Sequence, residues 1–469
     1  MNSQNQINGH RWLAPSVGLL FTVLVLAGCK GIPTQGERAA RRDLKTVGNT
    51  FQSQPAERHL PALTNDSSLG DYLRFAMLNQ PSVEAAYFDW AASVERITVE
   101  RSLPDPQLTF QSDIADIVMT VMPGFMQMFP GPGKLKAAAN VATAGSKAKY
   151  FAFETSVLQT AFSLKRAYYQ LWFLDENLRI NRQTLDLLAE LEEIARAQNA
   201  VGKVTLQDVY RAQIEQDQLT TEVANLEDSR RPLIAQLKGA LGLTRDQSDP
   251  PPPSWFESTP LDLTGDDLLA TAFARNPRLK LMEADVRLAE AAIALARKSK
   301  VPDFSLGLMA DAKAAPTMFR PQAGMTLPIW RDKIAAQIAQ AQATKRAAEA
   351  RLTSEQIMVT VDFAMKSYDY REITRNLALL QDKLIPKARQ SLEIARAGYL
   401  SGQIDFFNLL DAERTLLNFQ LQEVEARTRR EIVLADLSLS IAGIAPEGAP
   451  LLPPAASTSA PSSNQSTQH

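Results

Sequence analysis

The stretch GYLSGQIDFFNLLDA, residues 398–412, joins two long helical patterns and decides the fold. The pattern before it, roughly residues 331–398, and the pattern after it, roughly 404–442, are rich in Ala, Glu, Gln, Arg and Leu, which favour helix. Gly402 supplies the permissive backbone that a sharp turn between two helices requires. The stretch therefore predicts a helix–turn–helix tip.

The first half of the chain repeats this plan about 200 residues earlier. A helical pattern over 135–199 and a return helix over 205–242 flank Val201-Gly202-Lys203-Val204, the counterpart of Ser401-Gly402-Gln403-Ile404. Other matched stretches keep the same order: Asn79-Gln80-Pro81 with Asn276-Pro277, Leu103-Pro104-Asp105 with Val301-Pro302-Asp303, Phe129–Leu135 with Leu327–Ile334, and Leu241-Gly242 with Ala442-Gly443. We predict two repeats, 68–249 and 265–445, joined by a linker, 250–264.

Each repeat begins with two shorter helical patterns, 68–79 and 81–101 in the first and 266–275 and 277–299 in the second. A helix of about 65 residues would be about 100 Å long, which exceeds an ordinary domain and favours a rod or tube. The helices alone leave an extended coiled-coil spacer open, because Leu187, Leu191 and Ile194 have the spacing of a coiled-coil seam. Pro386 is expected to kink or break the second long helix.

The segments 104–130 and 302–328 have strand patterns instead. Phe304, Leu306 and Leu308 alternate with small or polar residues, and a second alternating run ends near Leu327. Two strands of about ten residues joined by a turn suit a bilayer-spanning β-hairpin. The first repeat predicts an equivalent hairpin, although its return strand, Val118 to Phe129, is apolar on both faces.

Two hairpins give four strands per chain, and an open sheet edge cannot face lipid. Closure therefore requires other copies. A dimer would give eight strands with a filled interior, whereas a trimer gives twelve, enough for a lumen. We predict a mainly α protein with membrane β structure: a homotrimer with a 12-stranded transmembrane β-barrel in the outer membrane and a long α-helical barrel in the periplasm.

The N-terminal residues have the pattern of export and lipid-anchoring signals. An apolar run from Trp12 to Leu26 is too short to remain as a transmembrane helix and is typical of a signal peptide, residues 1–28. Leu26-Ala27-Gly28-Cys29 resembles the bacterial lipobox, which implies a lipid on Cys29, and Lys30 at the next position implies sorting to the Gram-negative outer membrane. Residues 29–67 are predicted to be a lipid-anchored linker and residues 446–469 a disordered tail.

Composition excludes several function classes. Cys29 is the only cysteine and the chain has 3 histidines, so no disulfide framework and no zinc or copper site is expected. Fifty Lys and Arg against 52 Asp and Glu give no nucleic-acid signature. Nucleotide-binding and hydrolase motifs do not occur. We expect no enzyme activity, no bound metal and no cofactor other than the covalent lipid.

The whole plan resembles the outer-membrane efflux protein family, the TolC-like exit ducts of tripartite pumps. The residues that carry the resemblance are 398–412, with the Gly-Tyr-x-x-Gly and Asp-Ala elements, and 200–209 in the first repeat. The resemblance implies a periplasmic adaptor (membrane fusion protein) and an inner-membrane pump of the resistance-nodulation-division type as partners. It implies that the adaptor docks on the two tips, at Val201, Gly202, Lys203, Ser401, Gly402 and Gln403.

The resemblance also implies a periplasmic gate at Asp208, Tyr399, Asn408 and Asp411. In three chains, Asp208 and Asp411 would form carboxylate rings that favour cations; the alternative is that they complement the helix dipoles. Tyr399 would hydrogen-bond across the aperture or simply pack. Asn408 and Ile404 depart from the family, which has an aspartate and an arginine there, so a salt-bridged gate is in doubt.

The predicted function is a passive exit duct for metal cations or drugs. Phe129–Leu135 and Leu103-Pro104-Asp105-Pro106 resemble the heavy-metal efflux branch, and Met119, Met122, Met126 and Met128 gather in the first hairpin, where thioethers suit Cu(I) but are more often lipid-facing bulk. A duct of a type I protein secretion system is one alternative. A structural lipoprotein that spans the periplasm without a pore is the other.

Overall fold

The computed structural model describes residues 33–48, 60–115, 118–253, 256, 258, 265–311 and 318–445. The predicted signal peptide (1–28), Cys29 and the predicted tail (446–469) lie outside these residues. The chain divides into two compact units, each built from several segments. The first unit comprises the described parts of 1–45 with 91–147 and 284–348, and the second comprises the rest.

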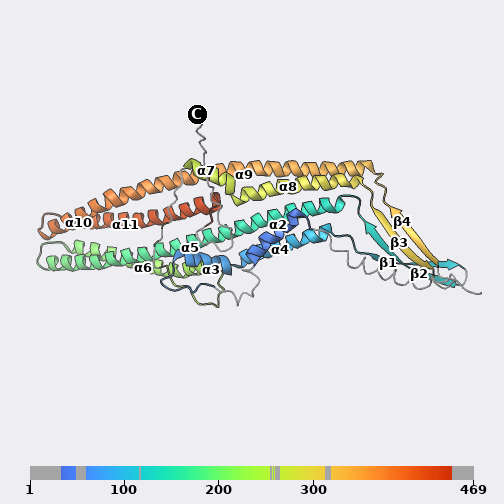
Figure 1. Ribbon diagram of the computed structural model, residues 1–469. Helices are drawn as coiled ribbons and strands as arrows, with labels where there is room; N and C mark the ends of the chain where they lie inside the picture. Colours follow the sequence, from blue (N-terminus) through green and yellow to red (C-terminus); the bar gives the residue numbers. More distant parts are fainter. Residues whose placement is uncertain are drawn as a thin grey trace, which may run out of the picture. The chain divides into compact units, whose positions relative to one another are not determined.

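Helices make up most of the described chain, as the sequence predicts (Figure 1). In the first repeat they are α3 (Leu69–Asn79), α4 (Pro81–Arg101), α5 (Lys134–Ala200) and α6 (Leu206–Ala240). In the second they are α7 (Gly265–Arg275), α8 (Pro277–Arg297) with the 3-10 turn η2 (Lys298–Lys300), α9 (Arg331–Leu379), α10 (Ile385–Leu400) and α11 (Phe406–Ala435) with the π-helical end η4 (Asp436–Ile441). None of the helices in the described ranges is both long enough and apolar enough to cross a membrane.

A helix, α2 (Gln35–Gly48), occupies part of the segment that was expected to be a linker. The helix is amphipathic, but it is rich in charged residues, and its buried residues include Glu37 as well as Val47. Glu37 is fully buried and accepts hydrogen bonds from Arg101 at 2.7 Å and Thr98 at 2.9 Å, while Arg41 donates two bonds to Glu95. Burial raises the pKa of Glu37, but these hydrogen bonds outweigh it, so the pKa is lowered overall.

The predicted break at Pro386 has a specific form. Residues Leu380–Leu384 make one π-helical segment, η3, and α10 then starts with Pro386 in its first turn. Proline is tolerated there because the first N–H groups of a helix have no intrahelical acceptor. The wider π turn therefore takes up the interruption, and the chain continues as helix to the tip.

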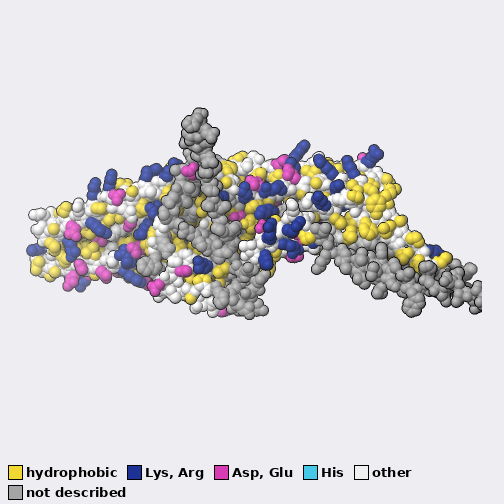
Figure 2. Space-filling model, in the orientation of Figure 1, with side chains coloured by type: hydrophobic (Ala, Val, Ile, Leu, Met, Phe, Trp, Pro, Cys, Tyr) yellow, Lys and Arg dark blue, Asp and Glu magenta, His cyan; other side chains and the backbone are white. Residues whose placement is uncertain are grey.

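Four antiparallel strands form one sheet in the order β1 (Gln107–Ala115), β2 (Val118–Phe129), β3 (Phe304–Asp311), β4 (Met318–Met325). Each predicted hairpin is confirmed, and the β2–β3 pairing joins the two repeats. One row across the sheet is apolar and exposed, because Leu108 pairs with Phe125, Phe125 with Leu308, and Leu308 with Pro321. Figure 2 shows hydrophobic side chains gathered over β3, β4 and the start of α9.

In the first unit, a hydrogen bond and an ion pair join the two hairpins at the ends nearest the long helices. The Asp303 carboxylate accepts a hydrogen bond from the Gly131 N–H at 2.7 Å and pairs with Lys134 Nζ at 2.7 Å. A Cβ on Gly131 would be 2.3 Å from the Pro302 carbonyl oxygen. Only glycine therefore allows residue 131 to lie this close to Pro302.

In the second unit, both halves of the chain contain the same kind of contact. The Asn79 side-chain amide donates to the Leu241 carbonyl at 2.9 Å, and the Asn276 amide donates to the Ile441 carbonyl at 2.8 Å. In each repeat an asparagine thus satisfies a carbonyl at the end of the return helix. A Cβ on Gly242, which has φ +71°, would be 2.7 Å from the Asn79 carbonyl oxygen.

The second unit has an aromatic core between α3, α4 and α5. Trp90 is 2% exposed and stacks on Phe153 with ring centroids 5.8 Å apart, and Tyr72 meets Tyr168 edge to face at 5.6 Å. Rings of this size bury much apolar area and restrict each other's orientation. This packing fixes the short helices of the first repeat against the long helix that leads to the tip.

Candidate functional site: the helix–turn–helix tips

The candidate site begins with the first turn, between α5 and α6. Gly202 has φ +75°. The N–H groups of Gly202 and Lys203 donate to the carbonyls of Asn199 and Gln198, each at 2.9 Å. This pair of bonds is a Schellman motif, whose left-handed residue is usually glycine because it has no Cβ.

The second turn, between α10 and α11, repeats this geometry. Gly402 has φ +76°, and the N–H of Gln403 donates to the Gly398 carbonyl at 2.8 Å. The side chain of Ile404 folds back over the helix, because a Cβ on Gly398 would be 2.6 Å from its Cδ1. An apolar contact within the turn thus occupies the position where the family pattern implies an arginine.

The predicted docking residues form the surface of these turns. Val201 is 69% exposed, and the side chains of Lys203, Ser401 and Gln403 are also exposed. Neither Gly202 nor Gly402 has an atom within 4 Å of the position that a Cβ would occupy. The tips are therefore open surfaces in the single chain, while their role in docking stays a prediction.

One core cluster brings the two helix pairs together behind the turns (Figure 1). The α6 side chain of Gln213 donates to Glu192 of α5 at 2.8 Å, which fixes the first pair. Ten buried residues form the cluster: Leu188, Leu191, Ala195, Val209 and Ala212 from the first pair, and Ala395, Tyr399, Phe406, Leu409 and Leu410 from the second. The two tips are therefore parts of one packed structure.

Tyr399 is the polar member of this cluster. It is 3% exposed, its ring centroid lies 5.3 Å from that of Phe406, and its hydroxyl has no hydrogen-bond partner among the described residues. Burial, and then the negative charge of Asp208, raise the pKa of Tyr399 to about 12. Tyr399 and Asp208 line the same cavity of about 460 Å³ between the two turns.

The other predicted gate residues occupy different surroundings. The Asp208 carboxylate accepts hydrogen bonds from the N–H and hydroxyl of Thr205 at the start of α6, which is a capping role. Asn408 is exposed, and its N–H donates to the Asp405 carboxylate at 2.9 Å. Asp411 is exposed and does not line the cavity that Asp208 and Tyr399 share. The single chain therefore brings together two of the four predicted gate residues.

Ion pairs link the two helix pairs across the tip. Arg414 of α11 pairs with Glu215 of α6 through two contacts, one of them between Nε and Oε2 at 3.1 Å. Arg396 of α10 pairs with Glu190 of α5 at 3.2 Å. Bidentate geometry makes the first pair the more directional of the two.

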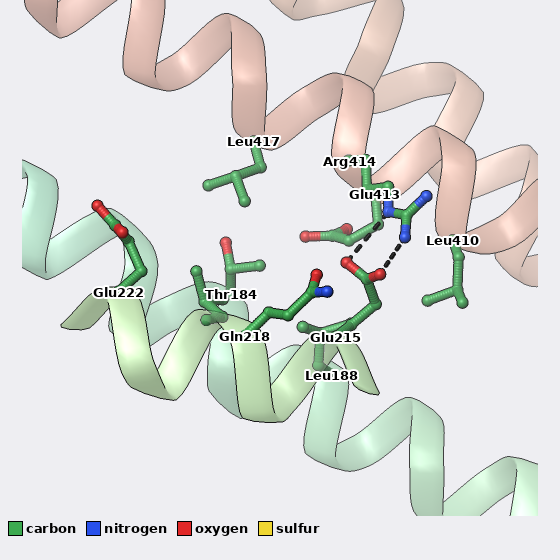
Figure 3. A pocket seen from close by; sticks show the side chains of 10 residues that line it. Thr184, Leu188, Glu215, Gln218, Glu222, Leu410, Glu413, Arg414 and Leu417 are labelled. Atoms are coloured by element: carbon green, nitrogen blue, oxygen red, sulfur yellow. Dashed lines mark hydrogen bonds and ion pairs between the residues drawn. The ribbon is translucent and has the colours of Figure 1, made fainter. Parts of the chain in front are cut away.

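Sequence reasoning missed Glu413, which is 4% exposed on α11 and has an oxygen without a partner among the described residues. Figure 3 shows it between α11 and the α5–α6 pair, beside the paired Glu215 and Arg414. Burial raises the pKa of Glu413 to about 7. A signal was available, because Leu409, Glu413 and Leu416 have the 4/3 spacing of a buried helix stripe.

Comparison with known proteins places this architecture in a family. The sequence profile of the outer membrane efflux protein family matches residues 73–243 and 268–443, one stretch in each half of the chain. Over 269 residues the chain is 22% identical to the cobalt-zinc-cadmium resistance protein CzcC of Cupriavidus metallidurans. That alignment covers 55% of this chain and 61% of CzcC, so it spans less than two thirds of the relative.

Solved structures share the fold. The crystal structure of a membrane protein from Pseudomonas aeruginosa aligns with a TM-score of 0.69 and 20% identity over 81% of this chain and 91% of that chain. The outer membrane protein VceC from Vibrio cholerae aligns with a TM-score of 0.66 and 18% identity over 80% and 95% of the two chains. Together with the profile match over most of the chain, the tandem helix–turn–helix architecture identifies this protein as a member of the outer membrane efflux protein family.

Proposed function

We propose that this protein is the outer-membrane exit duct of a tripartite efflux pump, a passive channel that takes its energy from an inner-membrane transporter. The observation that carries the proposal is the pair of equivalent tips, each a Schellman turn with an exposed surface, packed on one shared cluster. Membership of the outer membrane efflux protein family supports the same function. A periplasmic adaptor then docks on the exposed turns.

A trimer with a shared 12-stranded transmembrane β-barrel completes the duct. Strands β1 and β4 are the outer strands of the single-chain sheet, so each is free to pair with a neighbouring copy. The exposed apolar row through Leu108, Phe125 and Leu308 suits contact with lipid. The opposite face carries the Arg320–Asp311 ion pair, which suits a polar lumen.

The internal repeat predicts a contact between protomers. Within one chain, Asp303 of the second repeat pairs with Lys134 of the first. The matched residues are Asp105 and Lys333, which are both exposed. In a closed ring of repeats, Asp105 of one protomer would meet Lys333 of the next through the same contact.

Charge reversal tests this contact. Asp105→Lys or Lys333→Asp alone is expected to reduce the fraction of trimer on a native gel, because each places like charges together. The double variant should recover the trimer. A double variant no better than either single variant would contradict the pairing, while trimer formation by the unaltered chain tests the oligomer itself.

The proposed cargo is a divalent metal cation of the kind that the name of CzcC records, cobalt, zinc or cadmium. The resemblance of residues 129–135 to the heavy-metal branch points the same way, and drugs remain the other cargo class. Carboxylates at Asp208 and Asp411 near the tips would favour cations over anions in a trimer. Selection among cations then belongs to the inner-membrane pump.

Conductance in a planar lipid bilayer tests the duct. The purified protein should form channels, and Asp411→Ala should lower their preference for cations. Tyr399→Phe keeps the ring that packs on Phe406 and removes only the hydroxyl, so it separates a gating hydrogen bond from packing. Absence of channels from the protein and from both variants would favour a structural lipoprotein without a pore.

Cell assays separate efflux from protein secretion, the other alternative. Deletion of the gene should raise sensitivity to cobalt, zinc or cadmium and leave secreted proteins unchanged. The proposed lipid on Cys29 predicts a mature N-terminus that carries acyl mass, and Cys29→Ser should remove it. An unchanged mass would exclude lipidation and leave the duct proposal standing.

A further inference from the structure

A second cavity lies behind the tip core, between α5, α6 and α11. Its volume is about 290 Å³, near the lower end of the usual range for small-molecule sites. Leucines from all three helices form apolar walls, among them Leu188 and Leu417. The polar groups that line it are Thr184, Glu215, Gln218, Glu222, Glu413 and Arg414 (Figure 3).

Glu413 is the group in this cavity that the fold does not satisfy. Its side chain is buried, and its Oε2 has no hydrogen-bond partner among the described residues. A buried carboxylate oxygen without a partner is costly, and such groups are rare in native proteins. This oxygen is therefore available to a bound donor.

The equivalent position in the first half of the chain has a hydrogen-bond partner, which Oε2 of Glu413 lacks among the described residues. Glu413 is the eleventh residue after Gly402, and Gln213 is the eleventh after Gly202. Gln213 donates to Glu192 on the preceding helix, whereas the residue at the matching place in the second repeat is Leu392. A carboxylate thus replaces an amide, and a leucine replaces the residue that would face it.

Charge and shape define what fits. Arg414 is paired with Glu215, so Glu222 and ionised Glu413 leave the cavity with an excess of negative charge. No group of three or more metal-ligating His, Cys, Asp or Glu side chains occurs among the residues that the structure describes. Leucine walls suit an apolar body better than a hydrated ion.

We propose that this cavity binds a small organic ammonium ion, with its nitrogen donating to Glu413 and its apolar body against the leucines. The hydroxyl of Thr184 and the amide oxygen of Gln218 can accept the remaining ammonium protons. A ligand held there bridges the α5–α6 pair and α11, so it stabilises the packing behind the tip. The proposal goes beyond the duct function, since a duct need not bind its cargo.

Calorimetric titration of the purified full-length protein in detergent tests the proposal, with 2-phenylethylammonium as the probe. Glu413→Gln keeps the shape and removes the charge, and it should weaken binding at least about tenfold. Glu425→Gln, at an exposed position of the same helix, should bind like the unaltered protein. The neutral isostere 2-phenylethanol should also bind at least about tenfold more weakly than the amine.

The pH profile gives a second readout. The charged groups around Glu413 in the cavity are Glu215 and Glu222 from α6 and Arg414 from α11, while α5 contributes Thr184 and Leu188. Because burial raises the pKa of Glu413 to about 7, a proton competes with the amine below that pH. Affinity should therefore rise between pH 6 and pH 8 in the unaltered protein and stay flat in Glu413→Gln.

Three results would overturn the site: no measurable binding of the amine, equal binding by Glu413→Gln, or equal binding of the alcohol. Equal binding of the alcohol would identify an apolar cavity without recognition of charge. Circular dichroism and trimer content of Glu413→Gln confirm that the variant folds. Channel conductance is measured separately, so failure of this site and failure of the duct proposal are distinguishable.

Discussion

Glu413→Gln should stabilise the protein at pH 8 much more than at pH 5. The ordinary pKa of a glutamate is 4.5, and burial raises that of Glu413 to about 7 in the folded chain. The folded state therefore holds the proton more tightly than the unfolded state does. The resulting stability is fully present below pH 4.5 and is lost as the pH rises through 7.

The magnitude follows from the two pKa values. At about 1.4 kcal/mol per pKa unit, ionisation of Glu413 costs the folded state about 3 kcal/mol, of which about 2.5 kcal/mol is lost between pH 5 and pH 8. Because the side chain is only 4% exposed, solvent does little to screen this cost. Glutamine does not titrate, so the variant should escape this loss.

Thermal unfolding in detergent, followed by circular dichroism at both pH values, measures the effect. Any effect of the amide that does not depend on titration is the same at pH 5 and pH 8. The difference in melting temperature between variant and unaltered protein therefore changes between pH 5 and pH 8 only because Glu413 ionises. That change should amount to a few degrees in melting temperature. Glu425→Gln, exposed on the same helix, should show no such change. The same offset for Glu413→Gln at both pH values would refute the reasoning.

Four further substitutions test the packing. Gly202→Ala should lower the free energy of unfolding by about 1–2 kcal/mol, since only its φ of +75° opposes a Cβ. Gly242→Ala should lower it clearly more, because its Cβ would also lie 2.7 Å from a carbonyl oxygen. The melting temperatures of both variants check this order. Glu37→Gln should lower the free energy of local unfolding of α2 by about 1–3 kcal/mol, which is measured as faster amide exchange over 35–48. Because the pKa of Glu37 is lowered, the same loosening should occur in the unaltered protein as the pH falls below about 4.5. Asp303→Asn should lower the melting temperature by removing the charge that pairs with Lys134, and an unchanged value would show that the Gly131 contact suffices.

Much of the fold could be predicted because its signals are local or repeated. Helix-forming composition fixed α5 and α6 to within about one residue at the ends nearest the turn, and Gly202 marked the turn itself. Alternation marked the second hairpin and the first strand of the other, whose return strand is apolar on both faces. The helix α2 escaped prediction although it is amphipathic, because its high content of charged residues suggested a linker and its buried Glu37 is held by ion pairs.

The site was only partly predictable for a different reason. The turn glycines and Tyr399 are recognisable from the order of residues, and Asp208 follows its turn directly. Glu413 and the Arg414–Glu215 pair depend on which helix faces which, and residues about 200 positions apart meet there. Sequence order does not state such contacts.

The sequence by itself determined the long helices, the tight turns and the strand pairs, because each rests on backbone preferences over a few residues. It also pointed to the family, through the turn motifs at residues 398–412 and 200–209. Only the tertiary structure decided that Asp303 joins one hairpin to the other and that Glu413 faces a cavity between helix pairs. It also decided that the buried Tyr399 hydroxyl has no hydrogen-bond partner in the described part of the chain. Burial, charge pairing and unsatisfied hydrogen bonds arise only when distant segments pack, because water otherwise satisfies every one of these groups.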